Sequence, residues 1–207
     1  MKDETDDDKL DITPFFDYGI DIHTKTLYIG DVEDPDDDDR GVNARVASKA
    51  IKGLHLLDHV DTIDPITILL NMEGGDEVQC LAIYDAIKAC AHQTTIKVFG
   101  QCLSGGVWIL QAATNRLVAP NARLMIHAGT WGVGEDHPTV VKTWVKQYEK
   151  DEELSENILL ERIWEKQPEF TREQLREMLR FDTIFTPQEA IDLGLADAII
   201  LKSEIET

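Results

Sequence analysis

Residues 66–90, ITILLNMEGGDEVQCLAIYDAIKAC, carry the pattern that decides the fold of this chain. Residues 66–70 form a short apolar run rich in β-branched side chains, which predicts a buried strand. Gly74 and Gly75 follow, and they allow a sharp turn because neither has a Cβ that obstructs the backbone. Apolar residues then recur at helical spacing, with Ile83 and Ile87 beside them, which predicts a helix: Val78, Leu81, Ala82, Ala86 and Ala89.

The next stretch repeats this design. Residues 95–99 read as a strand, residues 100–106 as a turn, and residues 107–113 as the start of a helix. A third strand, Arg123–Ile126, ends just before His127. Successive strand–turn–helix units are typical of a parallel sheet with crossover helices, so the sequence predicts an α/β fold.

Three chemically active features fall where such strands end. In parallel sheets, binding and catalytic sites form where strand carboxyl ends meet helix amino ends, because unpaired backbone N–H groups point there. Ser104 begins one helix, Gly75 begins another, and His127 follows a strand. This set suits acyl transfer with a serine nucleophile, a histidine base and an oxyanion hole of glycine N–H groups. The alternative is that Ser104 only caps a helix and His127 lies in a loop.

The segment resembles the ClpP family, the proteolytic subunits of Clp proteases. The family shows a Gly-Gly turn, an Ile-Tyr-Asp helix, a Gly-Gln-x-x-Ser nucleophile turn and a Pro-Asn-x-Arg-x-Met-Ile-His strand, in that order. This chain has the same motifs in the same order: Gly74-Gly75, Ile83-Tyr84-Asp85, Gly100-Gln101-Cys102-Leu103-Ser104 and residues 120–127. Residues 181–190 and 194–197 resemble the family segment that carries the triad aspartate.

Mapped residue by residue, the resemblance implies Ser104, His127 and Asp182 as a catalytic triad. It implies the backbone N–H groups of Gly75 and Gly105 as the oxyanion hole. Substrate contacts are expected from Gly74 and from the glycine-rich segment after the histidine, which either adds a peptide as an extra strand or is a plain loop: Ala128, Gly129 and Thr130. A buried carboxylate at Asp182 would hold the imidazole in the required tautomer.

The resemblance also implies an architecture and partners. It covers residues 18–200 as one ClpP-like peptidase domain of the ClpP/crotonase fold, with a protruding handle over about residues 128–170. The expected assembly is a homo-oligomer of heptameric rings, single or stacked as a tetradecamer. Substrates would be short peptides or unfolded proteins, an AAA+ unfoldase would be the partner, and neither cofactor nor metal is expected.

Composition sets further bounds. A net charge of −20 over 207 residues argues against a nucleic-acid partner, since no basic patch is evident. The three cysteines show no metal or redox spacing, and Cys80 and Cys90 read as small core residues of a protein in a reducing compartment. No apolar run approaches the roughly 20 residues of a membrane span, and the first residues do not form a signal peptide. We therefore expect a soluble cytoplasmic protein without membrane contact.

The ends of the chain look different from its middle. Residues 1–40 hold 15 acidic and 4 basic side chains, which is typical of solvated segments. We expect residues 1–17 to be a flexible acidic leader and residues 201–207 a tail. Residues 26–32 predict a strand, and a helix is expected from about residue 42. His55 and His59 are spaced as a metal pair, but no third ligand is near in sequence, so a surface pair is expected.

Several positions depart from the ClpP pattern. Phe181 stands where many members have an arginine used between rings, and Gly105 where most have methionine. Met72-Glu73 replaces Ser-Pro, and Ala128-Gly129 replaces Gln-Pro. The axial N-terminal segment that engages an ATPase is not recognisable in residues 1–16, and residues 35–40 are an Asp-rich insert.

These departures keep two alternatives open. One is a catalytically silent subunit that assembles with active copies, and the other is a crotonase-type acyl-CoA enzyme. All three triad side chains and the backbone donors are retained, which favours an active peptidase. Glu73 and Asp76 flank the Gly-Gly turn, and they predict that acidic residues are disfavoured near the scissile bond.

Overall fold

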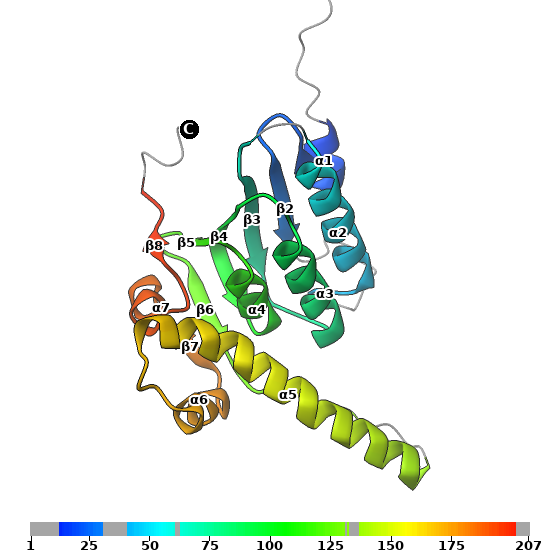
Figure 1. Ribbon diagram of the computed structural model, residues 1–207, viewed down its shortest axis with the longest axis vertical. Helices are drawn as coiled ribbons and strands as arrows, with labels where there is room; N and C mark the ends of the chain where they lie inside the picture. The colour runs from blue at the N-terminus through cyan, green and yellow to red at the C-terminus, as the bar shows by residue number, and fades with distance from the viewer. Residues whose placement is uncertain (1–12, 31–40, 61–62, 131, 133–136, 202–207) are drawn as a thin grey trace, which may run out of the picture.

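The computed structural model describes residues 13–30, 41–60, 63–130, 132 and 137–201 (Figure 1). It is a mixed α/β structure around one sheet with strand order β1-β2-β3-β4-β5-β8. Neighbouring strands from β2 to β8 along this path run parallel, while β1 runs antiparallel to β2. The strands on this path are β1 (Ile20–Asp21), β2 (Thr26–Gly30), β3 (Ile66–Met72), β4 (Thr94–Leu103), β5 (Asn115–Val118) and β8 (Ala198–Ile199). The parallel sheet predicted from the sequence is confirmed.

Three helices lie over the same face of this sheet (Figure 1). They are α2 (Ala44–Asp58), α3 (Glu77–Lys88) and α4 (Gly105–Gln111). Every second residue of β3 is fully buried in the hydrophobic core: Ile66, Ile68, Leu70 and Met72. The helix at residues 77–88 is as expected, but its buried face is not the one that the apolar spacing favoured. Cys80, Ile83 and Ile87 face the core, whereas Val78 is 66% exposed.

The predicted turn at residues 100–106 is wrong, because β4 continues through Leu103. The strand bends at Gly100, whose φ of +72° favours glycine, and a Cβ there would lie 2.7 Å from Asn71 Oδ1, the atom that accepts the Gln101 N–H. The pairing with β3 shifts there, and beyond the bend β4 pairs with β6 (Arg123–Ile126) instead of β5. The bend therefore separates the end of β4 from β5 and lets β6 join next to Ser104.

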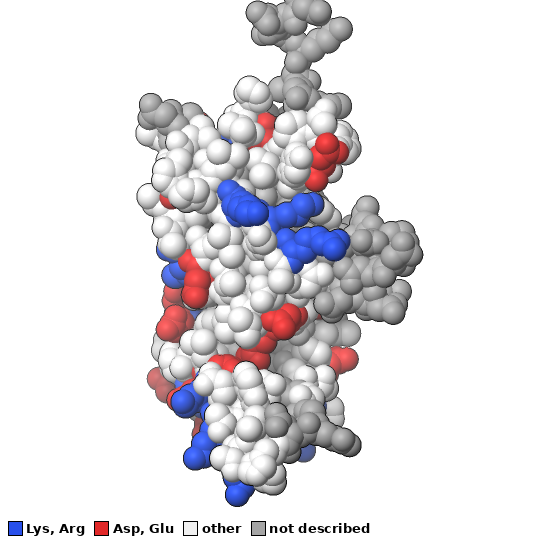
Figure 2. Space-filling view, turned by 90° about the vertical axis from the view of Figure 1, so that its right-hand side faces the viewer, with Lys and Arg blue, Asp and Glu red and all other residues white. Residues whose placement is uncertain are grey.

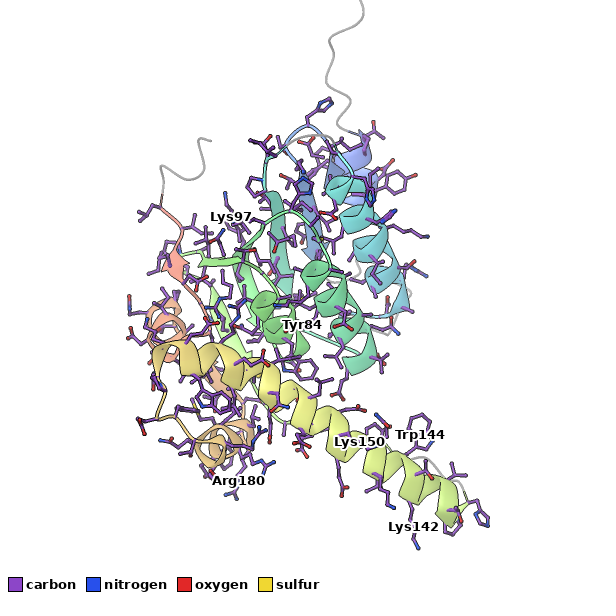
Figure 3. All side chains as sticks on the ribbon, in the orientation of Figure 1. Tyr84, Lys97, Lys142, Trp144, Lys150 and Arg180 are labelled. Carbon is purple, nitrogen blue, oxygen red and sulfur yellow. The ribbon has the colours of Figure 1, made fainter. Side chains whose placement is uncertain are left out.

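The long helix α5 (Pro138–Lys166) has two different halves. Its carboxyl half is packed on the body, where Ile158, Leu159, Leu160 and Ile163 are buried. Its amino half projects away from the sheet, and Lys142 and Trp144 lie on that part (Figures 1 and 3). The expected handle helix is present, but within one chain only half of its length is covered.

The chain then returns to the sheet edge. Helix α6 (Arg172–Leu179) begins with a capping box, in which the Thr171 side chain accepts the Gln174 N–H and the Gln174 side chain accepts the Thr171 N–H. It leads into β7 (Thr183–Phe185), which pairs antiparallel with β6. Helix α7 (Pro187–Leu193) follows and ends at Gly194. This return places residues 180–182 beside the end of β6.

The amino-terminal region differs from the expectation in one respect. Residues 13–17, which we assigned to the leader, belong to helix α1 (Thr13–Tyr18). Strand β2 ends at Gly30, and α2 begins after an Asn43 cap that accepts hydrogen bonds from the N–H groups of Arg45 and Val46. Residues 1–12 of the expected leader, the insert at residues 35–40 and residues 202–207 of the expected tail lie outside the described residues.

Charge is unevenly distributed on the surface. Basic side chains gather over α2 in Figure 2, and the exposed Arg45, Lys49 and Lys52 lie on that helix at helical spacing. The premise that the chain has no basic patch is therefore wrong, and the exclusion of nucleic acid remains a prediction from net charge alone.

None of the helices in the described residues combines the length and the apolar character needed to span a membrane.

Candidate active site

Ser104 occupies the sharp junction between β4 and α4. Its φ of +52° and ψ of −127° are rare for a residue with a side chain. Such strained positions cluster at functional sites, because the surrounding structure must over-determine them. The Ser104 N–H donates to the Met125 carbonyl at 2.8 Å, which fixes the end of β4 against β6. Although Ser104 is the residue that precedes α4, its side chain makes no capping hydrogen bond. The alternative role as a simple helix cap is therefore not supported.

Three side chains from different elements form a chain of hydrogen bonds. His127 Nε2 lies 2.9 Å from Ser104 Oγ, and His127 Nδ1 lies 3.0 Å from Asp182 Oδ1. His127 follows β6, and Asp182 lies between α6 and β7. With the ring proton on Nδ1, the imidazole donates to the carboxylate and Nε2 accepts from the serine hydroxyl. This is the order of contacts needed by a base that removes the serine proton.

Asp182 is not buried, contrary to expectation. Its side chain is 69% exposed, and the neighbouring Phe181 is 66% exposed. Both residues lie where the chain leaves α6 at the edge of the molecule, and no other part of the described chain covers them. Water therefore screens the ion pair between Asp182 and a protonated His127 more strongly than it would in a buried triad.

Gly74 lies directly against the candidate nucleophile. A Cβ at this position would lie 2.9 Å from Ser104 Cβ and 3.0 Å from the Gly105 nitrogen. Its φ of +95° is also one that residues with side chains rarely adopt. The turn therefore requires glycine for two reasons, and it brings the backbone of residues 74–75 next to Ser104.

The Gly75 N–H is left outside the backbone pairing of this turn. Gly75 forms an isolated parallel bridge with Val42. The bridge uses the Gly74 carbonyl, which accepts from Val42 N–H, and the Asp76 N–H, which donates to the Val42 carbonyl. Gly105 is the first residue of α4, where a backbone N–H has no partner within the helix. The two predicted oxyanion donors thus belong to adjacent backbone segments.

Gly105 also fits tightly against the helix behind it. A Cβ there would lie 2.6 Å from Cys80 Sγ. Burial, together with the negative charges of Asp76 and Glu77, raises the pKa of the Cys80 thiol to about 12. Burial likewise raises the pKa of Cys102, which is fully enclosed. Both thiols are neutral at physiological pH, so neither competes with Ser104 as a nucleophile.

The segment after His127 borders the site without forming a strand. Ala128, Gly129 and Thr130 are exposed and line the cavity next to Ser104, together with Gly74 and Gly75. The Ala128 N–H donates to the Leu179 carbonyl at 2.6 Å. The peptide-binding role predicted for this segment therefore rests on Gly129 and Thr130, since the Ala128 N–H is already engaged.

The cavity has a volume of about 510 Å³, and part of its wall was not expected from the sequence. Trp108 lies one helical turn after Ser104, so its proximity was readable from helix spacing. Tyr148 and Glu152 come from α5, and nothing in the local sequence indicates that this helix passes the site.

No group of three His, Cys, Asp or Glu side chains in the described part of the chain could hold a metal ion, and His55 and His59 are exposed.

Comparison with known proteins gives a consistent result. The Clp protease family model matches residues 39–203. An ATP-dependent Clp protease proteolytic subunit from Deinococcus radiodurans is 28% identical over 161 residues, which cover 77% of this chain and 76% of the relative. ATP-dependent Clp protease proteolytic subunit 2 from Prochlorococcus marinus is 25% identical over 192 residues, 89% of each chain.

A solved structure is also similar. A point mutant of ClpP1 from Listeria monocytogenes matches with a TM-score of 0.73 and 26% identity, and the match covers 89% of this chain and 96% of that one. The match confirms the fold that the sequence motifs predicted.

Proposed function

The chain belongs to the Clp protease family, and from this premise we propose that it is a serine endopeptidase with a Ser104–His127–Asp182 triad. Its substrates are short peptides or unfolded proteins. The observation that carries the proposal is the hydrogen-bonded series from Ser104 Oγ through the His127 ring to Asp182, at 2.9 and 3.0 Å. The family match favours this peptidase over the acyl-CoA alternative.

The first half of the reaction forms an acyl-enzyme. Ser104 Oγ attacks the peptide carbonyl carbon while its proton passes to His127 Nε2. The N–H groups of Gly75 and Gly105 stabilise the negative oxygen of the tetrahedral intermediate, and each such donor is commonly worth about 3 kcal/mol. The C–N bond then breaks, and His127 returns the proton to the leaving amine.

The second half restores the enzyme. Water attacks the acyl carbon, gives a proton to His127 Nε2, and displaces Ser104 Oγ, which takes that proton back. Asp182 keeps the Nδ1 proton directed away from the serine in both halves. Because Asp182 is exposed in the single chain, neighbouring copies that cover residues 181–182 would strengthen this contact.

The test compares the wild type with Ser104→Ala on short fluorogenic peptides, and records the mass of the assembly for both. Loss of hydrolysis in the variant, with the assembly unchanged, is the expected result. A fluorophosphonate should label the wild type at Ser104 and leave the variant unlabelled. Hydrolysis that survives in Ser104→Ala would refute the assignment of the nucleophile.

The exposed triad aspartate favours one second candidate, a catalytically silent subunit that assembles with active copies. A well-formed assembly of the wild type that takes no fluorophosphonate label and hydrolyses no peptide would support it. If mixing with an active relative also leaves Ser104 unlabelled, the peptidase proposal is wrong.

The remaining features are proposed from family membership. We expect a cytoplasmic homo-oligomer of heptameric rings, with residues 18–200 as its peptidase domain. Stacking of two rings would use the projecting half of α5. Degradation of folded proteins would need an AAA+ unfoldase as a partner, which would have to bind this chain without the axial amino-terminal segment that ClpP proteins use.

A further inference from the structure

The cavity beside Ser104 is walled by three helices. The start of α3 contributes Asp76 and Glu77, α4 contributes Trp108, and the middle of α5 contributes Tyr148 and Glu152. Because Ser104 and His127 also line it, a substrate residue whose carbonyl is attacked would place its side chain in this space. A volume of about 510 Å³ is ample for one long side chain.

The charge of this cavity is entirely of one sign. Four carboxylates line it, Glu73, Asp76, Glu77 and Glu152, and the described lining residues include neither lysine nor arginine. Lys150, labelled on α5 in Figure 3, is not part of the wall. Partial burial raises the pKa of Glu77, and repulsion from Asp151, Asp76 and Glu152 raises it further. The negative charges at this wall are therefore close enough to oppose one another.

Two of the carboxylates are already engaged. Asp76 accepts the Gln79 N–H at 2.9 Å as the cap of α3, which offsets the positive end of that helix. Glu73 accepts from Gln101 Nε2 at 3.3 Å. The carboxylates of Glu77 and Glu152, in contrast, make no hydrogen bond or salt bridge with any residue that the structure describes, although the charge of Glu152 helps to raise the pKa of Arg176. These two side chains can serve a ligand without giving up an internal contact.

Aromatic side chains complete the wall. Trp108 and Tyr148 are half-buried and border the same space as Glu77 and Glu152. The negative face of an aromatic ring attracts a guanidinium or ammonium group, and its surface also accepts the apolar stem of arginine or lysine. A purely apolar pocket would not place unpaired carboxylates beside these rings, and an acidic ligand would be repelled.

We infer that this cavity selects a basic residue, arginine or lysine, on the amino-terminal side of the scissile peptide bond. Glu77 and Glu152 receive the cationic head, while Trp108 and Tyr148 pack along its stem. This specificity rests on the proposed peptidase function. It extends the prediction that acidic residues are disfavoured, because it names the residue class that is favoured and the two side chains that select it.

The test uses fluorogenic peptides that differ at one residue, with arginine, its neutral isostere citrulline, or glutamate before the scissile bond. We expect kcat/KM for arginine to exceed that for citrulline by about tenfold, because cation–π and ion-pair contacts are both lost in citrulline. The glutamate peptide should be the poorest substrate. Added salt should reduce the preference for arginine, since the cavity is open to water.

The double variant Glu77→Gln/Glu152→Gln identifies the groups responsible. It should bring the ratio of arginine to citrulline to within about twofold, and Glu153→Gln, an exposed residue on the same helix outside the wall, should leave the ratio unchanged. Equal kcat/KM for arginine and citrulline in the wild type would overturn the inference. An arginine preference that survives in the double variant would overturn the assignment to these carboxylates.

A binding measurement separates this inference from the peptidase proposal. Labelled peptides with arginine or citrulline are titrated against Ser104→Ala and followed by fluorescence anisotropy. Tighter binding of the arginine peptide supports the cavity preference even if the wild type hydrolyses nothing, in which case only the proposed activity fails. Equal binding of both peptides refutes the preference whatever the activity of the wild type.

Discussion

Ser104 and Gly74 show how the site depends on single backbone positions. Ser104 is held at a positive φ by the end of β4 on one side and by α4 on the other. Gly74 is pressed against it so closely that the backbone of one turn contacts the backbone of the next. The site depends on the backbone positions of these two residues. Adding a single methyl group at Gly74 should therefore disturb it.

Gly74→Ala should abolish most of the activity. The added Cβ would lie 2.7 Å from the Leu103 carbonyl and 2.9 Å from Ser104 Cβ, so the turn must move away from the nucleophile. Displacing the Gly75 N–H with it should lower kcat/KM by about a hundredfold or more, the usual effect of losing one oxyanion donor. The steric and φ strain should also cost about 1–3 kcal/mol of the free energy of unfolding.

Gly129→Ala is the matched control for stability, because a Cβ at Gly129 would meet nothing within 4 Å. Its free energy of unfolding should stay within about 0.5 kcal/mol of the wild type. Urea denaturation and the rate of fluorophosphonate labelling measure the two effects. Labelling of Gly74→Ala at the wild-type rate would show that the turn does not support the nucleophile.

At the residue scale, the sequence predicts the side chains that belong to a family motif but not their exposure or their distant neighbours. Ser104, His127 and Asp182 could be proposed from motif order, and the structure brings their side chains within hydrogen-bonding distance. The exposure of Asp182 could not be foreseen, because it depends on what covers the end of α6. Tyr148 and Glu152 reach the cavity only through the direction of α5, which no local pattern encodes.

Among the elements, α6 connects the candidate site to the long helix α5. Glu156 on α5 is 2% exposed, and its two carboxylate oxygens lie 2.6 Å from Arg172 Nη1 and Arg176 Nε. At the other end of α6 the Leu179 carbonyl accepts from the Ala128 N–H, one residue after His127. The position of α6 therefore bears on both His127 and Asp182.

Glu156→Gln should weaken activity without touching the site. The change removes the charge that both arginines share, which should cost about 1–3 kcal/mol because the arginines remain partly solvated. A loosened α6 should lower kcat several-fold, with KM for a short peptide changing less. Thermal unfolding and steady-state kinetics on Glu156→Gln, with Glu153→Gln as an exposed control, test this. A destabilised variant with unchanged kcat would separate α6 from catalysis.

A second link between elements joins the end of α2 to the segment before β4. The Asp58 carboxylate accepts from the N–H groups of Ala91 and His92 and contacts His92 Nδ1 at 2.9 Å. Partial burial alone would raise the pKa of Asp58, but these hydrogen bonds outweigh it and lower the pKa to about 2. The carboxylate is thus held in its charged form by the folded chain.

This link predicts a loss of stability in acid. The pKa of Asp58 in the folded chain lies below its value in the unfolded chain. The contribution of the charged carboxylate to the free energy of unfolding is therefore fully present above about pH 4 and is lost as the pH falls towards 2. Asp58→Asn should cost about 1–2 kcal/mol at pH 7 and progressively less in acid. Chemical denaturation of both proteins from pH 7 to pH 2.5 gives the difference. A constant difference over this range would contradict the assignment.

The elements themselves were largely readable from hydrophobic periodicity. The strand at residues 66–72 and the helix at residues 77–88 follow from alternation and turn signals. The extension of β4 through Leu103 was missed because Gly100-Gln101 reads locally as a turn. At this bend β4 stops pairing with β5 and begins to pair with β6. The change of partner depends on the tertiary structure, and the local turn signal does not distinguish it from the end of a strand.

At the scale of the whole molecule, the amino half of α5 is a surface that no other part of the described chain covers. Val140, Trp144 and Tyr148 recur every four residues, and Trp144 is 52% exposed while its ring contacts Tyr148. Helices of this length gain most of their stability from an apolar face packed on something else. Phe181 stands where many ClpP proteins have an arginine used between rings, and the arginine before it, Arg180, is paired with Glu177 in the same chain and lies 5.9 Å from the centre of the Phe181 ring.

Trp144→Ala should therefore disrupt assembly before it disturbs the fold. Trp144 is 52% exposed and its ring contacts Tyr148, so the thermal unfolding of one copy should change only slightly. A partner copy seated on this stripe would lose its contact with the largest side chain of the stripe. Sedimentation velocity should show stacked assemblies in the wild type and units of half that mass in the variant, with Lys142→Ala on the same projecting segment unchanged. Activity should fall with stacking, because Tyr148 belongs both to the stripe and to the wall of the cavity. If Trp144→Ala sediments like the wild type, the projecting half of α5 does not join copies, and the contact between rings must be sought at another surface.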